Sequence, residues 1–451
     1  MLKKLLILAV LAVPVQSLSY TQSPQPLAAP EQAMSAFVDA SRQASNDLLA
    51  RLVSINSGTH NLEGVRAVAG IMKSELNELG FKVDFIPMDQ IQRAGVLIAE
   101  HPCPAPGKCG KRMLLIGHMD TVFEKNSPFQ AYTVKDNIAT GPGVNDMKGG
   151  LVVMLFALKA MKAAGVLNQS EITIVLSGDE EDHGEPSTIS RRDMISAAHH
   201  SDLALEFEGT PRIHGIFYGS VSRRSSITWR INATGETGHS SGIFSDHMGF
   251  GANYELVRIL DAFRAGLPEP NLTFNIGMVA GGTAVHIDEA GNNAAVTSKD
   301  NVVPPVAYAS GDIRTISNEQ TARVEKKMQE IVARHLPKTS ANITFGQGYP
   351  AMPPTAQNRA LLGILNQANA SLGFTAMPEL DPMKRGAGDI AFVADIVPGL
   401  AGVGATGEGA HAPGETIDLS AQPINTKRDA LLMYRLTQID QKADLTTVSA
   451  K

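Results

Sequence analysis

The spacing of apolar residues in the first half of the chain predicts strands and helices in alternation. Short continuous apolar runs are typical of buried strands, whereas apolar residues at every third or fourth position indicate helices. Because continuous apolar strands that alternate with helices are usually buried on both faces, this pattern indicates a mostly parallel sheet covered by helices. The expected strands lie at 82–98 (two strands around residues 88–90), 112–116, 171–176 and 203–207, and the expected helices lie within 33–79 and at 151–164.

The pattern changes near residue 222. Polar and apolar positions alternate over 226–233, a helix is expected at about 249–265, and further alternating strands end at Arg314 before a helix at 318–335. This order of strand, helix, two strands and helix is typical of a small α+β domain with one exposed sheet face.

After residue 347 the first pattern returns, with a helix at 358–371, a strand at 400–403 and a helix at 426–438. The sequence therefore predicts a discontinuous α/β domain, residues 33–221 and 339–440, interrupted by an inserted α+β domain, residues 222–338. The length of 451 residues agrees with two domains, because a single core usually stops growing near ~250–300 residues.

Composition and charge narrow the class of ligand. The chain has 43% hydrophobic and 19% charged residues, as globular proteins do. Its net charge of −6, without basic clusters, gives no electrostatic reason to bind nucleic acid or anionic lipid. A small molecule or a peptide is therefore the expected ligand.

The first 19 residues have the three regions of a secretory signal peptide. Two lysines precede the apolar run 5–15, and the more polar stretch 16–19 follows it. A membrane anchor is the alternative, but this run is shorter than the ~20 residues that span a bilayer, and no later segment is long and apolar enough. We expect export to the periplasm or the medium, with no membrane attachment after residues 1–19 are removed.

Cys103 and Cys109 are the two cysteines of the chain, and they bracket a loop rich in Pro and Gly. In an oxidising compartment we expect them to form a disulfide. Two thiols could instead bind a metal, but a zinc site would need further ligands, and this hairpin offers none.

Residues that can bind a metal follow the ends of predicted strands, where the loops of a parallel sheet converge. His118 and Asp120 come directly after strand 112–116; the imidazole can bind a metal while the carboxylate holds its other nitrogen. Taken alone, such a pair is more often structural. Glu208 follows the strand that ends at Phe207, and His411 lies in a glycine-rich stretch after strand 400–403.

Two further segments supply carboxylates. The glycine-rich turn 141–150 carries Asp146, and because its spacing matches neither the Walker pattern nor the dinucleotide fingerprint, we interpret Asp146 as a metal ligand rather than an N-cap. The acidic segment 177–182, with Glu180 and Glu181, directly follows a buried strand. A solvated loop is the ordinary interpretation of an acidic run, but packed carboxylates repel one another unless a cation compensates them.

Together these segments offer a ligand set of two imidazoles and three carboxylates: His118, Asp146, Glu181, Glu208 and His411. Nitrogen and oxygen ligands without thiolate suit Zn²⁺, Co²⁺ or Mn²⁺ in a hydrolytic site rather than a structural zinc knot. Two such metals that share a carboxylate and a hydroxide lower the pKa of bound water from 15.7 toward ~7. Amide hydrolysis would then need no Ser or Cys nucleophile.

In their residues and in their order along the chain, five motifs resemble those of the co-catalytic zinc hydrolases. This family includes acetylornithine deacetylase, succinyl-diaminopimelate desuccinylase and the bacterial glutamate carboxypeptidases. The resemblance covers about residues 33–438 and is greatest to the glutamate carboxypeptidases. The motifs are residues 117–120, 141–150, 178–181, 207–208 and 409–411.

This resemblance implies two Zn²⁺ ions bridged by Asp146. His118 and Glu208 would complete one metal site, and Glu181 and His411 the other. It also implies that residue 180, a glutamate, is the general base and that residue 120, an aspartate, orients the first histidine. The peptide bond between residues 146 and 147 is a candidate for the rare cis form.

The inserted segment resembles the family's ferredoxin-like lid domain, which implies a homodimer formed through the lid. His239 matches the lid histidine that reaches a neighbouring active site and stabilises the oxyanion. Arg314 matches the arginine that binds the substrate carboxylate, and Asn275 is a further candidate for a substrate contact. Gly386 lies in a loop that resembles the glycine-rich loop near that carboxylate, and Arg385 beside it is an accessory candidate.

Two segments depart from the family pattern. The link between the lid motifs is stretched over residues 284–300, and Arg212 and His214 stand where the family's specificity loop would be aligned. The first departure could alter dimerisation or substrate reach, and both bear on the choice of substrate.

Three functions remain to be compared. Export favours a metallocarboxypeptidase that releases a carboxyl-terminal, glutamate-like amino acid from a small peptide or conjugate. An N-acyl amino acid deacylase with the same metals and Glu180 as general base is the alternative. A non-catalytic binding protein of the same fold is disfavoured, because all five ligand positions and Glu180 are present.

Overall fold

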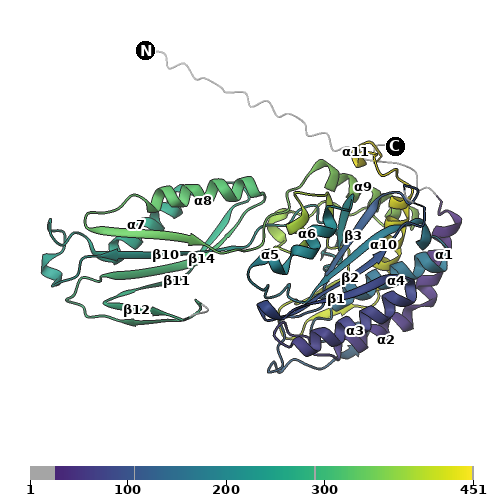
Figure 1. Ribbon diagram of the computed structural model, residues 1–451, viewed down its shortest axis with the longest axis horizontal. Helices are drawn as coiled ribbons and strands as arrows, with labels where there is room; N and C mark the ends of the chain where they lie inside the picture. The colour runs from purple at the N-terminus through teal and green to yellow at the C-terminus, as the bar shows by residue number, and fades with distance from the viewer. Residues whose placement is uncertain (1–25, 106, 289–290, 449–451) are drawn as a thin grey trace, which may run out of the picture.

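The computed structural model describes residues 26–105, 107–288 and 291–448, so the predicted signal segment 1–19 lies outside the described residues. The chain forms an elongated molecule with a larger α/β domain at one end and a smaller α+β domain at the other (Figure 1). The smaller domain is inserted between two parts of the larger one, as the sequence predicts.

The larger domain is built on a mixed sheet with the strand order β1-β2-β6-β3-β7-β16. Strands β6, β3, β7 and β16 run parallel, while β1 and β2 pair antiparallel at one edge. The parallel core explains the continuous apolar runs and confirms the predicted fold class. The strands are β1 (Lys82–Met88), β2 (Arg93–His101), β3 (Arg112–His118), β6 (Glu171–Ser177), β7 (Leu203–Glu206) and β16 (Gly399–Ala401).

Helices cover both faces of this sheet (Figure 1). The stretch 33–79, predicted to be helical, is broken into separate helices, and Asn61 starts the last of them because its side chain accepts a hydrogen bond from the Gly64 N–H at 3.2 Å. The helices are α1 (Ala29–Ala40), α2 (Arg42–Val53), α3 (Leu62–Leu79), α4 (Lys148–Ala163), α5 (Ser187–Ser190), α6 (Arg192–Ala198), α9 (Ala356–Ser371), α10 (Gln422–Thr437) and α11 (Leu445–Val448).

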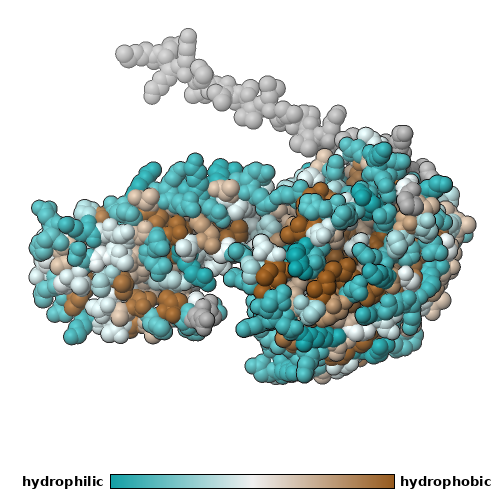
Figure 2. Space-filling model, viewed as in Figure 1, coloured by the Kyte–Doolittle hydropathy of each residue, from teal (hydrophilic) through white to brown (hydrophobic). Residues whose placement is uncertain are grey.

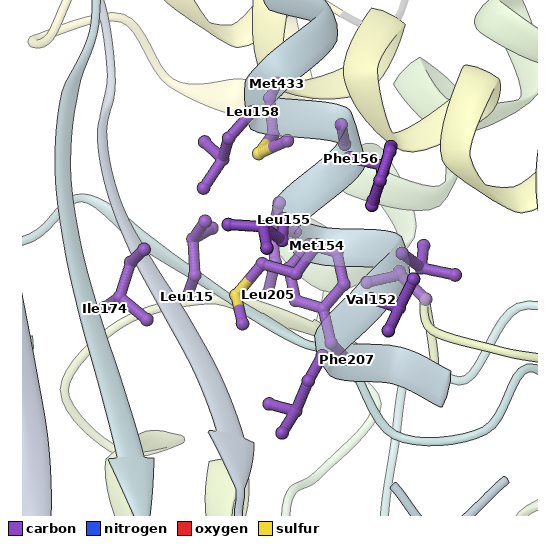
Figure 3. Close-up of a cluster of buried hydrophobic side chains, with 14 of the residues drawn as sticks. Leu115, Val152, Met154, Leu155, Phe156, Leu158, Ile174, Leu205, Phe207 and Met433 are labelled. Carbon is purple, nitrogen blue, oxygen red and sulfur yellow. The ribbon is translucent and has the colours of Figure 1, made fainter. Parts of the chain in front are cut away.

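Helix α4 lies at the centre of the hydrophobic core. Figure 3 shows its apolar side chains between Leu115 and Ile174 of the sheet and Met433 of α10. Because α4 packs on the sheet with one side and on α10 with another, its residues 151–158 form an unbroken apolar run. This packing fixes the start of α4, and with it the turn that carries Asp146.

The inserted domain has an antiparallel sheet with the strand order β11-β14-β10-β15, which is the ferredoxin-like arrangement. Helices α7 and α8 pack on one face around the buried Trp229. Strand β15 pairs with β10, so this sheet extends beyond residue 338, where the sequence places the domain boundary. The elements are β10 (Ile227–Gly235), α7 (Gly251–Gly266), β11 (Thr273–Gly282), β14 (Val306–Arg314), α8 (Asn318–Val332) and β15 (Thr339–Phe345).

Smaller elements complete the fold. The stretched link at 284–300 forms a hairpin of β12 (Ala284–Ile287) and β13 (Ala294–Thr297). A small sheet joins the two parts of the larger domain near their ligand-bearing loops, in the order β17-β18-β5-β4. Its strands are β4 (Thr133–Lys135), β5 (Ile138–Thr140), β17 (Gly407–Glu408) and β18 (Thr416–Asp418), and a further hairpin comprises β8 (Arg212–Ile213) and β9 (Ile216–Phe217).

None of the helices in the described part of the chain is both long enough and apolar enough to cross a membrane.

The expected disulfide between Cys103 and Cys109 is present, which confirms the predicted pairing. Because the bond joins residues only 6 positions apart, replacing both cysteines by serine is expected to lower the free energy of unfolding by only about 2 kcal/mol. Urea denaturation of the two proteins measures this difference. Reductant should shift the urea midpoint of the parent protein to that of the variant and leave the midpoint of the variant unchanged. A parent protein whose midpoint does not change with reductant would contradict the expectation.

Candidate metal centre

The predicted ligands meet at the carboxyl-terminal edge of the parallel strands, where open α/β sheets bind ligands. His118 is the last residue of β3, Glu181 follows β6, and Glu208 follows β7. His411 comes from the loop between β17 and β18, and Asp146 from the turn before α4. Side chains separated by up to 293 positions in the sequence numbering (411 − 118) are thus brought together.

The five side chains form two groups that share Asp146. In the first, His118 Nε2 lies 3.1 Å from Asp146 Oδ1 and 3.3 Å from Glu208 Oε1. In the second, His411 Nε2 lies 3.1 Å from Asp146 Oδ2 and 3.0 Å from Glu181 Oε2. One carboxylate with an oxygen directed to each histidine is the arrangement that a bridging ligand needs. The Asp146–Met147 peptide bond is cis, in agreement with the resemblance.

The chemistry of this donor set fits divalent cations. Burial raises the pKa of Glu181 to about 7, and hydrogen bonds to Asp146 and Glu181 raise the pKa of His411 to about 11. Glu181 Oε1 is buried and has no hydrogen-bond partner among the described residues. Packed carboxylates repel one another, and here they take up protons to reduce that repulsion. A divalent cation would displace those protons, compensate the negative charge and give the unpartnered oxygen a partner.

Glu180 lies beside the two groups. With His118 and Glu181 it forms a third set of side chains close enough to hold an ion. Its backbone oxygen accepts a hydrogen bond from the Tyr349 hydroxyl at 2.5 Å. Burial raises the pKa of the Glu180 carboxyl well above its ordinary value, which favours its protonated form and suits a group that exchanges protons.

Asp120 organises both the first histidine and the acidic loop. Its carboxylate lies 3.4 Å from His118 Nδ1 and accepts hydrogen bonds from the backbone N–H groups of Glu180 at 3.0 Å and Glu181 at 3.1 Å. The Thr59 hydroxyl donates to it at 2.6 Å. Asp120 is fully buried. Asp120 therefore positions His118, Glu180 and Glu181, whereas the sequence analysis assigned it only the contact with His118.

Glu415 positions the shared ligand, and sequence reasoning missed it. Its buried carboxylate accepts hydrogen bonds from the backbone N–H groups of Gly143 at 2.9 Å, Asn145 at 2.7 Å and Asp146 at 2.8 Å. Burial raises the pKa of Glu415 to about 7. Glu415 belongs to none of the motifs described above. The sequence shows only that it is an acidic residue four positions after His411, in the same glycine-rich stretch.

The buried Arg191 forms ion pairs that hold the acidic loop 177–182 in place. Arg191 Nη1 lies 2.7 Å from Asp179 Oδ1, and Arg191 Nε lies 2.7 Å from Asp389 Oδ1. Its Nη2 also donates to the Tyr349 hydroxyl at 3.0 Å. Because Asp179 precedes Glu180 and Asp389 lies in the returning part of the α/β domain, this network joins the two parts of the domain beneath the site.

The substrate-binding candidates lie near the junction between the two domains, which is called the hinge below. A Cβ at Gly386 would lie 3.7 Å from Arg314 Nη1, so these two predicted residues are neighbours. Arg314 Nε donates to Asp312 at 2.9 Å, and Asn275 pairs with Asp312 across β11 and β14. Figure 2 shows a notch between the two domains on this face of the molecule.

His239 lies outside the metal-binding groups. It is exposed and follows the end of β10 that is remote from the larger domain, about 30 Å along a nine-residue strand from the hinge. Its Nδ1 is hydrogen-bonded to Ser241 Oγ at 2.8 Å. In this arrangement His239 does not join the site of its own chain.

Metal binding is expected to stabilise the folded chain. Zn²⁺ at 100 times its Kd should raise the free energy of unfolding by about 2.7 kcal/mol, because the ligands converge only in the folded state. Thermal denaturation of metal-free protein with and without Zn²⁺ measures the effect. Asp146→Ala should abolish most of it, since both groups lose a ligand, whereas Asp84→Ala on the exposed face of β1 should retain it. Equal stabilisation of both variants would contradict the shared role of Asp146.

Known proteins with similar sequence place this chain among metallopeptidases and related amidohydrolases. The family described as Peptidase family M20/M25/M40 matches residues 114–433. Carboxypeptidase G2 from Pseudomonas sp. (strain RS-16) is 28% identical over 399 residues, which cover 86% of this chain and 88% of that protein. Succinyl-diaminopimelate desuccinylase from Acidiphilium cryptum (strain JF-5) is 25% identical over 358 residues, covering 78% and 88%.

Among solved structures, a dinuclear metal-binding peptidase from Bacillus subtilis superposes with a TM-score of 0.61. The two chains are 16% identical, and the match covers 89% of this chain and 99% of the other. This likeness confirms the fold.

Proposed function

This chain belongs to peptidase family M20/M25/M40, and from that membership we propose that it is an exported dizinc carboxypeptidase that releases a glutamate-like carboxyl-terminal residue. The family makes it a hydrolase of the metallopeptidase and amidohydrolase type. The metal, the substrate, export and dimerisation are the parts that we propose.

One observation carries the proposal: two ligand groups share Asp146, and Glu180 lies next to both. Two metals held side by side are suited to hydrolysis of an amide bond without a covalent intermediate. The matching B. subtilis structure is described as a dinuclear metal-binding peptidase. Zn²⁺ fits the imidazole and carboxylate donors, and Co²⁺ or Mn²⁺ would fit the same set.

When bound, the two metal ions would polarise the scissile carbonyl and make water a better nucleophile. Glu180 accepts the proton of the attacking water and passes it to the leaving nitrogen, which requires a carboxyl whose pKa is raised, as burial does here. Asp120 fixes the His118 ring and the backbone of the acidic loop. Glu415 fixes the turn that carries Asp146. These contacts set the geometry before substrate arrives.

We assign recognition of the carboxyl terminus to Arg314, with Gly386 and Asn275 beside it. Arg314 stands at the end of β14, and its Nη1 faces the loop of Gly386. The hydrogen bond from Arg314 Nε to Asp312 holds the guanidinium in place, and we assign its Nη groups to the substrate carboxylate. The name carboxypeptidase G2 of the similar Pseudomonas protein supports this choice of substrate end.

We further propose a homodimer formed through the lid domain. Several large apolar side chains are exposed on this domain (Figure 2), and solvent-exposed apolar patches are typical of protein interfaces. A partner subunit would also give the remote His239 a site to complete. The exposed apolar residues are Phe244, Tyr254, Val257, Ile276, Val279 and Val296.

Export rests on the leader-like residues 1–19 and is supported by the disulfide between Cys103 and Cys109, since disulfides persist in oxidising compartments. An exported enzyme would act on peptides or conjugates outside the cytoplasm.

A substrate panel tests the function. Purified Zn²⁺-loaded protein should hydrolyse peptides and acyl conjugates of glutamate with a free carboxyl terminus, and should not hydrolyse the same compounds with an amidated terminus. The competing function is N-acyl amino acid deacylation, favoured by the similarity to a desuccinylase. Higher kcat/KM for simple N-acetyl or N-succinyl amino acids than for any peptide would establish that alternative.

A further inference from the structure

Arg385 has donors that nothing in the described chain accepts. It lies in the loop between η4 (Pro382–Lys384) and η5 (Asp389–Val393). Its Nε and Nη2 atoms are buried and have no hydrogen-bond partner among the described residues, and only 16% of the side chain is exposed. A buried guanidinium without an acceptor is unfavourable, because desolvation is not compensated. Such a group is expected where a ligand supplies the acceptor.

The neighbouring Arg223 shows what a structural arginine in the same place does. Its Nη1 lies 2.5 Å from Glu206 Oε2, its Nε donates to Gly386 O at 3.0 Å, and its Nη2 donates to Ala387 O. Arg223 thus uses all three of its nitrogen atoms and compensates Glu206. The nearest carboxylate to Arg385 is Glu208 at 3.8 Å, which is beyond hydrogen-bond distance and is already engaged with His118.

The two unpartnered atoms lie on one edge of the guanidinium. Nε–H and Nη2–H point in parallel and match the two oxygens of a carboxylate. Other arginines of the same chain use this edge in that way, and Arg112 and Arg359 are two examples. Arg112 donates through Nε at 3.2 Å and Nη2 at 2.7 Å to Asp202, and Arg359 donates through Nε at 2.8 Å and Nη2 at 3.0 Å to Glu379. Arg385 presents the same edge with no carboxylate of the described chain at hydrogen-bond distance.

The position of Arg385 points to the substrate. It approaches Glu208, a member of the first ligand group, and the next residue in its loop, Gly386, faces Arg314 of the lid. A Cβ at residue 402 would lie 3.1 Å from Nη2, so a glycine there leaves room for the guanidinium. Arg385, whose Nε and Nη2 lack acceptors, and Arg314, whose Nη1 faces Gly386, therefore meet at one loop, and two guanidinium groups suit a substrate with two carboxylates.

We propose that Arg385 binds the side-chain carboxylate of the released residue through Nε and Nη2, and thereby makes the enzyme selective for an acidic residue. This inference rests on the proposed carboxypeptidase function, in which Arg314 binds the terminal carboxylate. Arg385 is then a substrate-binding residue, and it requires no change in how the metals or Glu180 act.

Matched substrates test this assignment. N-acylated glutamate and glutamine conjugates have nearly the same shape and both keep the terminal carboxylate, so they differ in the charge that Arg385 would bind. The parent enzyme should prefer the glutamate conjugate. Arg385→Gln should raise KM for the glutamate conjugate roughly 10- to 100-fold and change KM for the glutamine conjugate little, so that the preference disappears. Arg385→Lys should restore only part of it, because an ammonium lacks the fork.

Arg359→Gln is the matched control, since Arg359 makes a bidentate pair with Glu379, is half exposed, and neither residue belongs to the ligand groups. It should keep the preference of the parent. If Arg385→Gln lowers kcat/KM equally for both conjugates, or keeps the preference for the glutamate conjugate, Arg385 does not bind the side-chain carboxylate. If Arg385→Gln fails to fold, the lysine variant decides by the same comparison. A parent enzyme that hydrolyses neither conjugate would refute the proposed function itself.

Discussion

Glu180→Gln is expected to lower kcat roughly 10²–10⁴-fold while both metals remain bound. Glutamine keeps the size and polarity of the side chain but cannot accept and return a proton. The surrounding contacts should survive, because Tyr349 and Asp120 hold the backbone of residue 180 rather than its carboxylate. Steady-state kinetics together with metal analysis of the purified variant measures both quantities.

Glu181→Gln is the matched comparison, because it changes the adjacent carboxylate, which lies 3.0 Å from His411 Nε2. This variant should lose metal, and its activity should recover in part when excess Zn²⁺ is added. Glu180→Gln should not respond to added metal. Because Glu180 also lies close enough to His118 and Glu181 to hold an ion, loss of metal from Glu180→Gln would show that it is a ligand and refute its role as general base.

The candidate site could be predicted from the sequence because its residues follow strong local signals. His118, Glu181 and Glu208 come directly after buried strands, whose apolar runs are easily recognised, and the topology of a parallel sheet then brings strand ends together. Asp146 and His411 stand in glycine-rich loops. The structure brings all five side chains into two groups that share Asp146.

Residues that act through backbone hydrogen bonds could not be predicted in this way. Glu415 accepts from three N–H groups that lie about 270 positions earlier, and its environment exists only after the small sheet of β5 and β18 has formed. Those strands have three residues each, which is too short for periodicity to show. The break between α2 and α3 does carry a sequence signal that the prediction left unused: residues 54–61 contain a single apolar side chain, Ile55, and the Asn61 cap marks the new helix.

Tertiary pairing also decides where the lid ends. Strand β15 alternates inside and outside positions as a sheet strand should, but the sequence does not say to which sheet it belongs. Pairing with β10 places it in the lid.

Arg191 could likewise not be recognised from the sequence, and its replacement is expected to have the largest effect on stability. Arg191→Met should lower the free energy of unfolding by about 3–5 kcal/mol, because it leaves the buried carboxylates of Asp179 and Asp389 without their counter-ion. Arg192→Met is the matched control: Arg192 is adjacent but more than half exposed, and its ion pair with Asp193 should contribute about 0–1 kcal/mol. Chemical denaturation of the metal-loaded proteins measures both.

The pH dependence separates a lost counter-ion from a lost packing contact. Burial raises the pKa of Asp389, and Arg191 opposes this rise, so removing Arg191 should raise the folded-state pKa further. An acid whose pKa is higher in the folded state than in the unfolded state destabilises the fold once it is ionised, so the deficit of Arg191→Met should grow as pH rises and shrink as pH falls toward 5. Adding Asp389→Asn should recover part of the loss at neutral pH, since one unpaired charge is removed. A deficit that is constant with pH and unaffected by Asp389→Asn would mean that Arg191 stabilises the loop by packing on Tyr349 and Phe392 rather than by its charge.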